Sequence, residues 1–123
     1  MMQRLKLAAL GLLLASCSMA GAKAADSVYG KWKRPDGSVA MVSACGGKLC
    51  GHLVSGPQTG YEMFHGMGKT GPDKWQGNKM KNPSAPGFMT FNGTAVLKGN
   101  TLSVQGCAIG QSMCGHENWT RVK

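Results

Sequence analysis

Residues 87–107 read GFMTFNGTAVLKGNTLSVQGC and contain two dipeptides that favour tight turns, Asn92-Gly93 and Gly99-Asn100. Glycine and asparagine tolerate the positive φ angles of a two-residue β-hairpin loop, so each dipeptide predicts a hairpin. The second turn places Leu97 opposite Leu102. The stretch therefore predicts three antiparallel strands joined as a meander.

The two turns also predict which residues share a face of this meander, because side chains alternate along a strand. One face is expected to carry Phe88, Thr90, Ala95, Leu97, Leu102 and Val104. The other face is expected to carry Met89, Phe91, Thr94, Val96, Lys98, Thr101, Ser103 and Gln105. Both turns place the same face inward, as a folded meander requires.

The rest of the chain consists of short β-like runs between turn signals. These signals include Pro35-Asp36-Gly37, Gly46-Gly47, Gly56-Pro57 and Gly71-Pro72-Asp73. The 19 glycines of the 123-residue chain disfavour helices, because each costs about 1 kcal/mol relative to alanine in a helix. Residues 66–86 are rich in glycine, proline and lysine and predict a long loop with at most a short strand at 78–81. The spacing is typical of one all-β antiparallel sandwich or barrel.

The first 24 residues have the features of an export signal. Arg4 and Lys6 precede an apolar run at residues 7–15, and Ala22-Lys23-Ala24 fits a cleavage site. The run is too short to span a bilayer. Cleavage there would leave a single domain at residues 25–123 that is periplasmic or secreted. An alternative stays open, because Leu14-Ala15-Ser16-Cys17 fits lipoprotein processing, which would anchor the protein to the envelope through Cys17.

The chain is basic, with 14 Lys and Arg against 5 Asp and Glu. Removing the three basic leader residues Arg4, Lys6 and Lys23 leaves 11 against 5, a net charge of +6. The remaining positive charges are scattered singly, which is typical of a solvated surface with lysines at sheet edges. Weak contact with an anionic envelope surface is the functional alternative. Nucleic acid is not an expected partner, since no basic motif with interleaved aromatic residues occurs.

Four cysteines remain once Cys17 is set aside. Cys45 and Cys50 flank a glycine turn, and Cys107 and Cys114 flank a second reversal. An even number of cysteines in a small exported domain predicts disulfides, and cross-strand spacing favours the local pairs 45–50 and 107–114. A four-cysteine zinc site is disfavoured, because neither pair has the C-x-x-C spacing.

The two ends of the chain contain a pattern that would close a barrel. Gly30 and Trp32 share one face of the first strand, and Trp119 and Arg121 share one face of the last. If these strands are neighbours, Arg121 lies over the Trp32 indole and contributes about 0.5–2 kcal/mol of cation–π attraction. We expect this contact to be structural.

The Gly-x-Trp start with a late arginine resembles the lipocalin and calycin pattern. A larger ordered set of motifs is similar to the bacterial domain of unknown function 2147 family: Gly30-Lys31-Trp32, Cys45-Gly46, Leu49-Cys50-Gly51, Trp75-Gln76-Gly77, Asn82-Pro83, Gly106-Cys107 and Trp119-Thr120-Arg121-Val122. The resemblance extends from residue 27 to 122 and departs from the family pattern around residues 83–88. It implies an exported, lipocalin-like up-and-down β-barrel and no established activity.

These observations favour a non-enzymatic barrel that holds a small apolar or amphipathic ligand in its mouth. A solid barrel with a structural or envelope-binding role is one alternative. A soft-metal site for copper is another, because Met63, His65 and Met67 alternate and would share a face of an extended segment. No catalytic motif is found, although a triad assembled in space stays open. We expect no cofactor.

Overall fold

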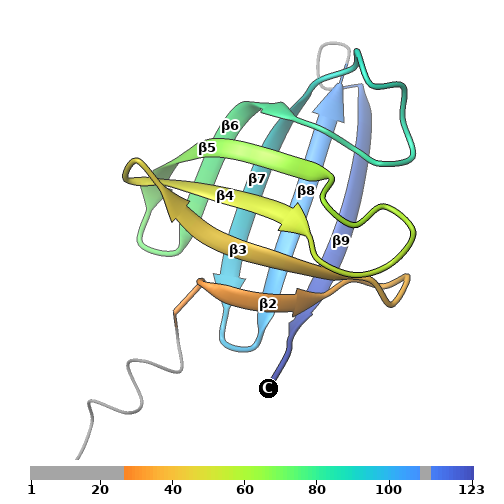
Figure 1. Ribbon diagram of the computed structural model, residues 1–123. Helices are drawn as coiled ribbons and strands as arrows, with labels where there is room; N and C mark the ends of the chain where they lie inside the picture. Colours follow the sequence, from red (N-terminus) through yellow and green to blue (C-terminus); the bar gives the residue numbers. More distant parts are fainter. Residues whose placement is uncertain (1–26, 109–111) are drawn as a thin grey trace, which may run out of the picture.

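Eight antiparallel strands form one closed barrel (Figure 1). The computed structural model describes residues 27–108 and 112–123. The strands are β2 (Gly30–Lys33), β3 (Val39–Cys45), β4 (Lys48–Leu53), β5 (Glu62–Gly71), β6 (Lys74–Met80), β7 (Phe91–Lys98), β8 (Thr101–Ala108) and β9 (Met113–Arg121). Each strand pairs with the next in the chain, and β9 pairs with β2 to complete the ring. The expected up-and-down β-barrel is confirmed.

The barrel has two different ends. The loops at residues 34–38, 54–61 and 81–90 lie together at one end, on the right of Figure 1, which we call the mouth. The turns at 46–47, 72–73 and 99–100 lie at the opposite end, which we call the base. Short turns at the base and longer loops at the mouth make the mouth the more accessible end.

Both predicted disulfides are present. Cys45 and Cys50 are joined across the β3–β4 turn at the base, with a Cα–Cα distance of 5.9 Å. Cys107 and Cys114 are joined between β8 and β9, with a Cα–Cα distance of 4.0 Å. Each closes a local hairpin, so the unfolded-state entropy that it removes is small.

The prediction for residues 87–107 is half right. The Gly99-Asn100 turn is confirmed, since Leu97 pairs with Leu102 and both are buried. The Asn92-Gly93 turn is wrong, because β7 runs straight through these residues. Gly93 instead lies between two neighbouring strands, and a Cβ there would clash with Met80.

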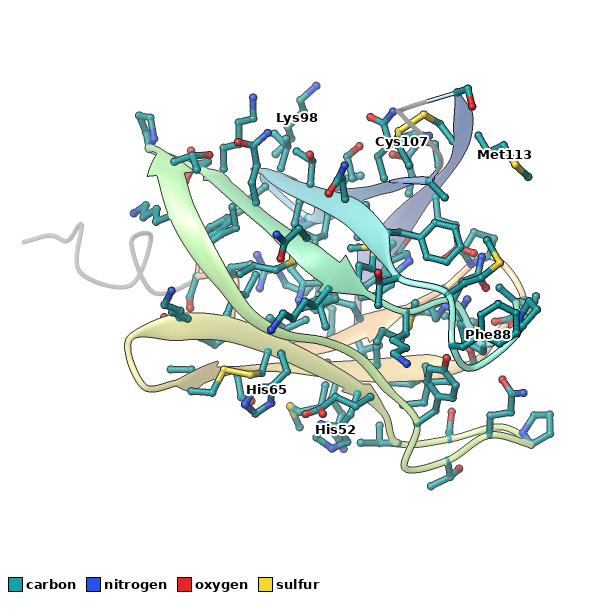
Figure 2. The ribbon with its side chains drawn as sticks, turned by 90° about the horizontal axis from the view of Figure 1, so that it is seen from above. His52, His65, Phe88, Lys98, Cys107 and Met113 are labelled. Atoms are coloured by element: carbon teal, nitrogen blue, oxygen red, sulfur yellow. A yellow bond between two sulfur atoms is a disulfide. The ribbon has the colours of Figure 1, made fainter. Side chains whose placement is uncertain are left out.

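This correction changes the predicted inner face. Ala95, Leu97, Leu102 and Val104 are buried as expected. Phe88 and Thr90 precede β7 and do not belong to that face; Phe88 is 85% exposed at the edge of the molecule (Figure 2). A glycine required for close packing and a glycine required for a turn look alike in sequence.

The predicted loop at residues 66–86 is also wrong. Strands β5 and β6 occupy most of it and form a hairpin through Pro72-Asp73. Met67 and Trp75 are buried on these strands and supply apolar anchors that outweigh the low β-propensity of the surrounding glycines. The expected short strand at 78–81 is the end of β6, and the connection that follows runs from residue 81 to 90.

The base is closed by the predicted contact between the first and last strands. Trp32 pairs with Arg121 across β2 and β9, and the Arg121 guanidinium carbon lies 4.5 Å from the centroid of the Trp32 ring. Arg121 also donates hydrogen bonds to the carbonyl oxygens of Ser27 (2.7 Å) and Gly99 (3.0 Å). The Trp32 indole donates to the Val28 carbonyl at 2.9 Å. These contacts fill the base of the barrel between the first and last strands.

Candidate functional site: the barrel mouth

A row of four glycines crosses the inner wall below the mouth. Gly77, Gly93, Gly106 and Gly115 are successive cross-strand partners on β6, β7, β8 and β9. Met80 packs over the second and third members, where an added Cβ would clash with it. Nothing lies within 4 Å of a Cβ built at Gly115. The wall consequently leaves open space on the β9 side.

That space is part of a cavity of about 230 Å³ at the mouth. Its lining residues come from seven elements: Arg34, Met63, Met80, Lys81, Asn82, Phe91, Val104, Gly106, Gly115, His116 and Glu117. Met63, Met80, Phe91 and Val104 form an apolar wall. Arg34 and Glu117 form a charged wall, so the cavity is amphipathic.

Arg34 and Glu117 meet inside the barrel. Arg34 Nε donates to Glu117 Oε1 at 3.2 Å, and Nη2 donates to Oε2 at 3.2 Å. The Arg34 side chain is only 8% exposed, whereas that of Glu117 is 38% exposed. A bidentate pair of this kind fixes both groups in position, because two parallel hydrogen bonds define the planes of the guanidinium and the carboxylate.

Three neighbours hold this ion pair. Arg34 Nη1 donates to Ser38 Oγ at 3.1 Å and lies 3.5 Å from Asp36 Oδ2. The buried Trp119 indole donates to Glu117 Oε1 at 2.7 Å. The network joins the β2–β3 turn to β9 and forms a rigid polar rim.

Asp36 is part of this rim and titrates abnormally. The Ser38 hydroxyl donates to Asp36 Oδ1 at 2.6 Å and the Ser38 amide donates at 2.9 Å. These hydrogen bonds, with a smaller contribution from the Arg34 charge, hold the pKa of Asp36 below its ordinary value of 3.8, although burial opposes the shift.

A depressed pKa in the folded state predicts a specific acid dependence. The Asp36 contribution to stability is present above its unfolded pKa and is lost as the pH falls through its folded pKa. Asp36→Asn should therefore reduce the loss of stability on acidification below about pH 4. Because the side chain is 62% exposed, we expect a difference below about 1 kcal/mol. Urea unfolding at stepped pH values measures it. Ser38→Ala should give an intermediate dependence, and identical acid curves for all three proteins would contradict the assignment.

Two further hollows lie outside this site. A broad groove of about 810 Å³ is bordered by outward-facing polar side chains such as Gln76, Thr94 and Gln105. Another of about 340 Å³ lies between β5 and β6 near Phe64 and Met67. Neither groove is bordered by the buried ion pair that makes the mouth distinctive.

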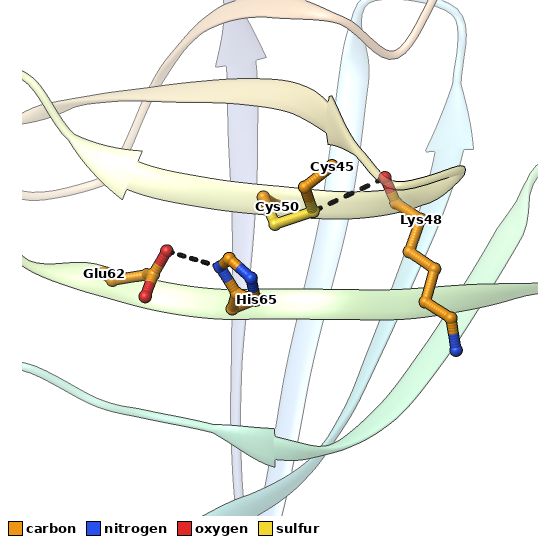
Figure 3. Close-up of a disulfide and its surroundings, with 5 residues drawn as sticks. All are labelled: Cys45, Lys48, Cys50, Glu62 and His65. Carbon is orange, nitrogen blue, oxygen red and sulfur yellow. Dashed lines mark hydrogen bonds and ion pairs between the residues drawn. A yellow bond between two sulfur atoms is a disulfide. The ribbon is translucent and has the colours of Figure 1, made fainter.

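The predicted soft-metal set is not brought together. Met63 and Met67 are buried in the core, whereas the His65 side chain is 68% exposed on the outer face. The regular alternation that the prediction assumed is broken by register shifts between β4 and β5 and by a positive φ of 94° at Gly66. The expectation that Met63, His65 and Met67 share one face, on which the copper hypothesis relied, is therefore wrong. His65 lies instead beside the Cys45–Cys50 disulfide (Figure 3).

The sequence reasoning missed Arg34 and Glu117 as a pair. Strand alternation carries the signal: Arg34 follows Trp32 by two residues, and Glu117 precedes Trp119 by two residues. If both tryptophans face inward on neighbouring strands, an inward arginine and an inward glutamate must meet there. The predicted leader at residues 1–24 and the alternative lipidation site Cys17 lie outside the described residues.

Two observations bear on the environment of the protein. Disulfides persist in oxidising compartments, so the two bonds are typical of a protein outside the cytoplasm. Within residues 27–108 and 112–123, no helix is long and apolar enough to cross a membrane.

A family model described as an uncharacterised protein conserved in bacteria (DUF2147) matches residues 54–121, more than half of the chain. The matched segment includes all of β5 to β9, and therefore Glu117 and the whole glycine row. No curated protein and no solved structure matches the chain. The chain belongs to the DUF2147 family of uncharacterised bacterial proteins, as its motifs predict.

Proposed function

We propose that this protein is a non-enzymatic binding module that holds a small, neutral amphipathic molecule in the barrel mouth. The observation that carries the proposal is the 230 Å³ cavity with one apolar wall and one ion pair whose arginine is buried. Ligand sites in proteins commonly combine mostly apolar walls with a few placed polar groups. The closed base directs any occupant to the mouth.

The cavity volume limits the size of the ligand. A water molecule takes about 30 Å³ of liquid volume, so 230 Å³ corresponds to roughly seven or eight waters. A ligand of about that many non-hydrogen atoms fits. Long acyl chains and multi-ring molecules are too large unless the loop at residues 81–90 moves.

The donors and acceptors that the ion pair leaves available indicate which polar group a ligand would carry. The Arg34 guanidinium has five N–H groups, and four of them donate to Glu117, Ser38 and Asp36. Among the described residues, no acceptor engages the fifth, which is available to a ligand. Glu117 accepts three hydrogen bonds and retains about one lone-pair site. A hydroxyl group both donates and accepts, so it complements both remaining positions. A free carboxylate would meet the negative charge of Glu117, and the lysine that lines the cavity, Lys81, already donates a hydrogen bond to the Gly87 carbonyl oxygen.

The geometry favours a ligand-binding role over an enzymatic one and over a purely structural one. The His116 imidazole is hydrogen-bonded to Ser103 Oγ at 2.7 Å, and both residues belong to the outward-facing positions of β8 and β9. It is therefore turned away from the cavity. A barrel with only a structural or envelope-binding role would have no need for a cavity that exposes a charged carboxylate.

Binding of a short alcohol tests the proposal. We expect 1-hexanol to shift the backbone amide resonances of Val104, Gly106 and Gly115 in NMR titrations of the folded protein. Hexanoate, of similar size but negatively charged, should bind at least about tenfold more weakly, a difference of about 1.4 kcal/mol. Native mass spectrometry of gently purified protein should also detect a small co-purified molecule.

A cavity-filling variant and a matched control test whether hexanol binds in the mouth. Gly115→Leu places a side chain in the cavity with no clash at Cβ, so it should abolish the hexanol shifts while the fold is retained. Gly68→Leu is the control, because Gly68 has equally open surroundings and borders the outer groove. Equal loss of binding in both variants, or hexanol binding unaffected by Gly115→Leu, would count against a ligand site in the mouth.

A further inference from the structure

The outer face of the barrel near the base carries a second cluster of chemically active side chains. Cys50 on β4 lies directly opposite His65 on β5. Cys45 is bonded to Cys50 across the β3–β4 turn. One ligand atom from each of these three residues lies within 4.8 Å of the other two (Figure 3).

The cluster faces away from the core. Leu49 is fully buried, and a Cβ at Gly51 would point at the core residue Phe64, so the residue between them, Cys50, faces outward. Cys50 is nevertheless only 6% exposed, whereas His65 is 68% exposed. The pair therefore combines a sheltered sulfur with an accessible imidazole.

A carboxylate orients the imidazole. Glu62 Oε2 lies 2.8 Å from His65 Nδ1. An ionised carboxylate only accepts hydrogen bonds, so Nδ1 carries a proton, and in the neutral imidazole Nε2 has the free lone pair. Histidines that bind metals typically have this second partner, which fixes both the tautomer and the ring orientation.

We propose that reduction of the Cys45–Cys50 disulfide turns this cluster into a binding site for one Zn²⁺ ion. A dithiol or phosphine reductant breaks the sulfur–sulfur bond, supplies two electrons and is itself oxidised, leaving two thiols. Binding of Zn²⁺ then forms two zinc–thiolate bonds and one zinc–imidazole bond and releases the two thiol protons. The oxidation state of the zinc ion does not change, and one water molecule occupies the fourth position of the tetrahedron.

The distances suit this chemistry. Zinc–sulfur bonds of about 2.3 Å and zinc–nitrogen bonds of about 2.0–2.1 Å place tetrahedral ligand atoms roughly 3.5–3.8 Å apart. The imidazole nitrogen, which lies within 4.8 Å of both sulfurs, therefore needs to approach by about 1 Å, and the two sulfurs, about 2 Å apart while bonded, must separate by a little under 2 Å. The Cα–Cα distance of 5.9 Å gives the released sulfurs room to separate by side-chain rotation. Two thiolates and an imidazole are a donor set that zinc favours.

The second disulfide offers an internal control. Among residues 27–108 and 112–123, Cys107 and Cys114 form no such three-ligand cluster, and the side chain beside Cys107 is the amide of Gln105, 3.4 Å away. The imidazole two residues from Cys114, that of His116, is engaged by Ser103 Oγ through Nε2 at 2.7 Å. The same reduction therefore yields two thiols there without an imidazole within the ligand distance that His65 has.

Cobalt binding to two double variants tests the site. Cys107→Ser/Cys114→Ser retains the proposed site, and Cys45→Ser/Cys50→Ser retains only the other pair. After phosphine reduction, the first variant should bind one Co²⁺ per chain with thiolate-to-cobalt charge-transfer absorption, and Zn²⁺ should displace the cobalt. The second variant, and both proteins in their oxidised state, should show no such absorption. Equal absorption in the two reduced variants overturns the proposal.

The role of the imidazole is tested separately. His65→Gln in the Cys107→Ser/Cys114→Ser background should weaken Co²⁺ binding by at least about tenfold, whereas His52→Gln on the same face should change it less than about twofold. Near-ultraviolet circular dichroism reports whether the reduced barrel is folded. Reduced protein that is folded and binds no cobalt overturns the proposal, and so does reduced protein that has unfolded, because the site must exist on the barrel. These readouts do not depend on hexanol binding in the mouth.

Discussion

Glu117→Leu should lower the free energy of unfolding by about 3–5 kcal/mol, because it leaves the Arg34 charge buried without its main partner. Arg34 is 8% exposed and donates two hydrogen bonds to Glu117. The remaining acidic neighbour, Asp36, is 3.5 Å away and mostly exposed, so it compensates only in part. The Trp119 indole also loses its acceptor. Urea unfolding followed by tryptophan fluorescence measures the change.

Two further variants separate the buried charge from the loss of packing. Arg34→Met/Glu117→Leu replaces the pair with apolar side chains and should recover most of the lost stability, because an apolar pair avoids the desolvation of both charges. Glu62→Leu removes an exposed carboxylate that pairs with His65 and should cost less than about 1 kcal/mol. If Glu117→Leu costs no more than Glu62→Leu, Arg34 reaches solvent and the mouth has no buried ion pair.

Two dipeptides that look alike in sequence, Gly99-Asn100 and Asn92-Gly93, show how far the fold could be predicted. The Gly99-Asn100 turn was predictable because it needs only local information: Gly99 adopts a φ of 61°, which glycine tolerates best. The Asn92-Gly93 dipeptide has the same local signature but lies inside β7, near its start. Its glycine is required because Met80, from β6, packs against it. The sequence alone does not say which neighbour will approach a given glycine.

The candidate site was less predictable than the barrel. Pairing of Cys45 with Cys50 and stacking of Arg121 on Trp32 follow from short turns and from closure of the sheet. The contact between Arg34 and Glu117 joins residues 83 positions apart and depends on which way two strands face. The expected grouping of Met63, His65 and Met67 on one face was wrong for a related reason, because register shifts between β4 and β5 break the alternation on which it relied.

The glycines link the fold to its proposed function. At the mouth, the absence of a side chain at Gly115 leaves the cavity open. Deeper in the barrel, the absence of a side chain at Gly51 lets an aromatic ring fill the interior. Glycine therefore leaves space at Gly115, where no neighbouring side chain occupies it, and allows close packing at Gly51, where the Phe64 ring does.

Gly51→Ala should disrupt the core strongly, with a loss of about 3 kcal/mol, the upper part of the range for overpacked cores. The added Cβ would lie 2.5 Å from Phe64 Cζ and within 2.9 Å of both Cε atoms. Phe64 is 1% exposed and its ring stacks on Trp119 with centroids 6.2 Å apart. Trp119 is in turn held by its hydrogen bond to Glu117. Displacement of the ring toward Trp119 would therefore reach the mouth.

Three comparisons distinguish overpacking from a general intolerance of alanine. Gly68→Ala, on the neighbouring strand, adds a Cβ with nothing within 4 Å and should change the unfolding free energy by less than about 0.5 kcal/mol. Phe64→Leu in the Gly51→Ala background should cost less than the sum of the two single changes, since the smaller side chain makes room for the new methyl group. Gly51→Ala should also weaken hexanol binding, because the strain passes through Trp119 to Glu117. Additive unfolding energies for Gly51→Ala and Phe64→Leu would show that the ring does not confine residue 51, and the path from the core to the mouth would then have no basis.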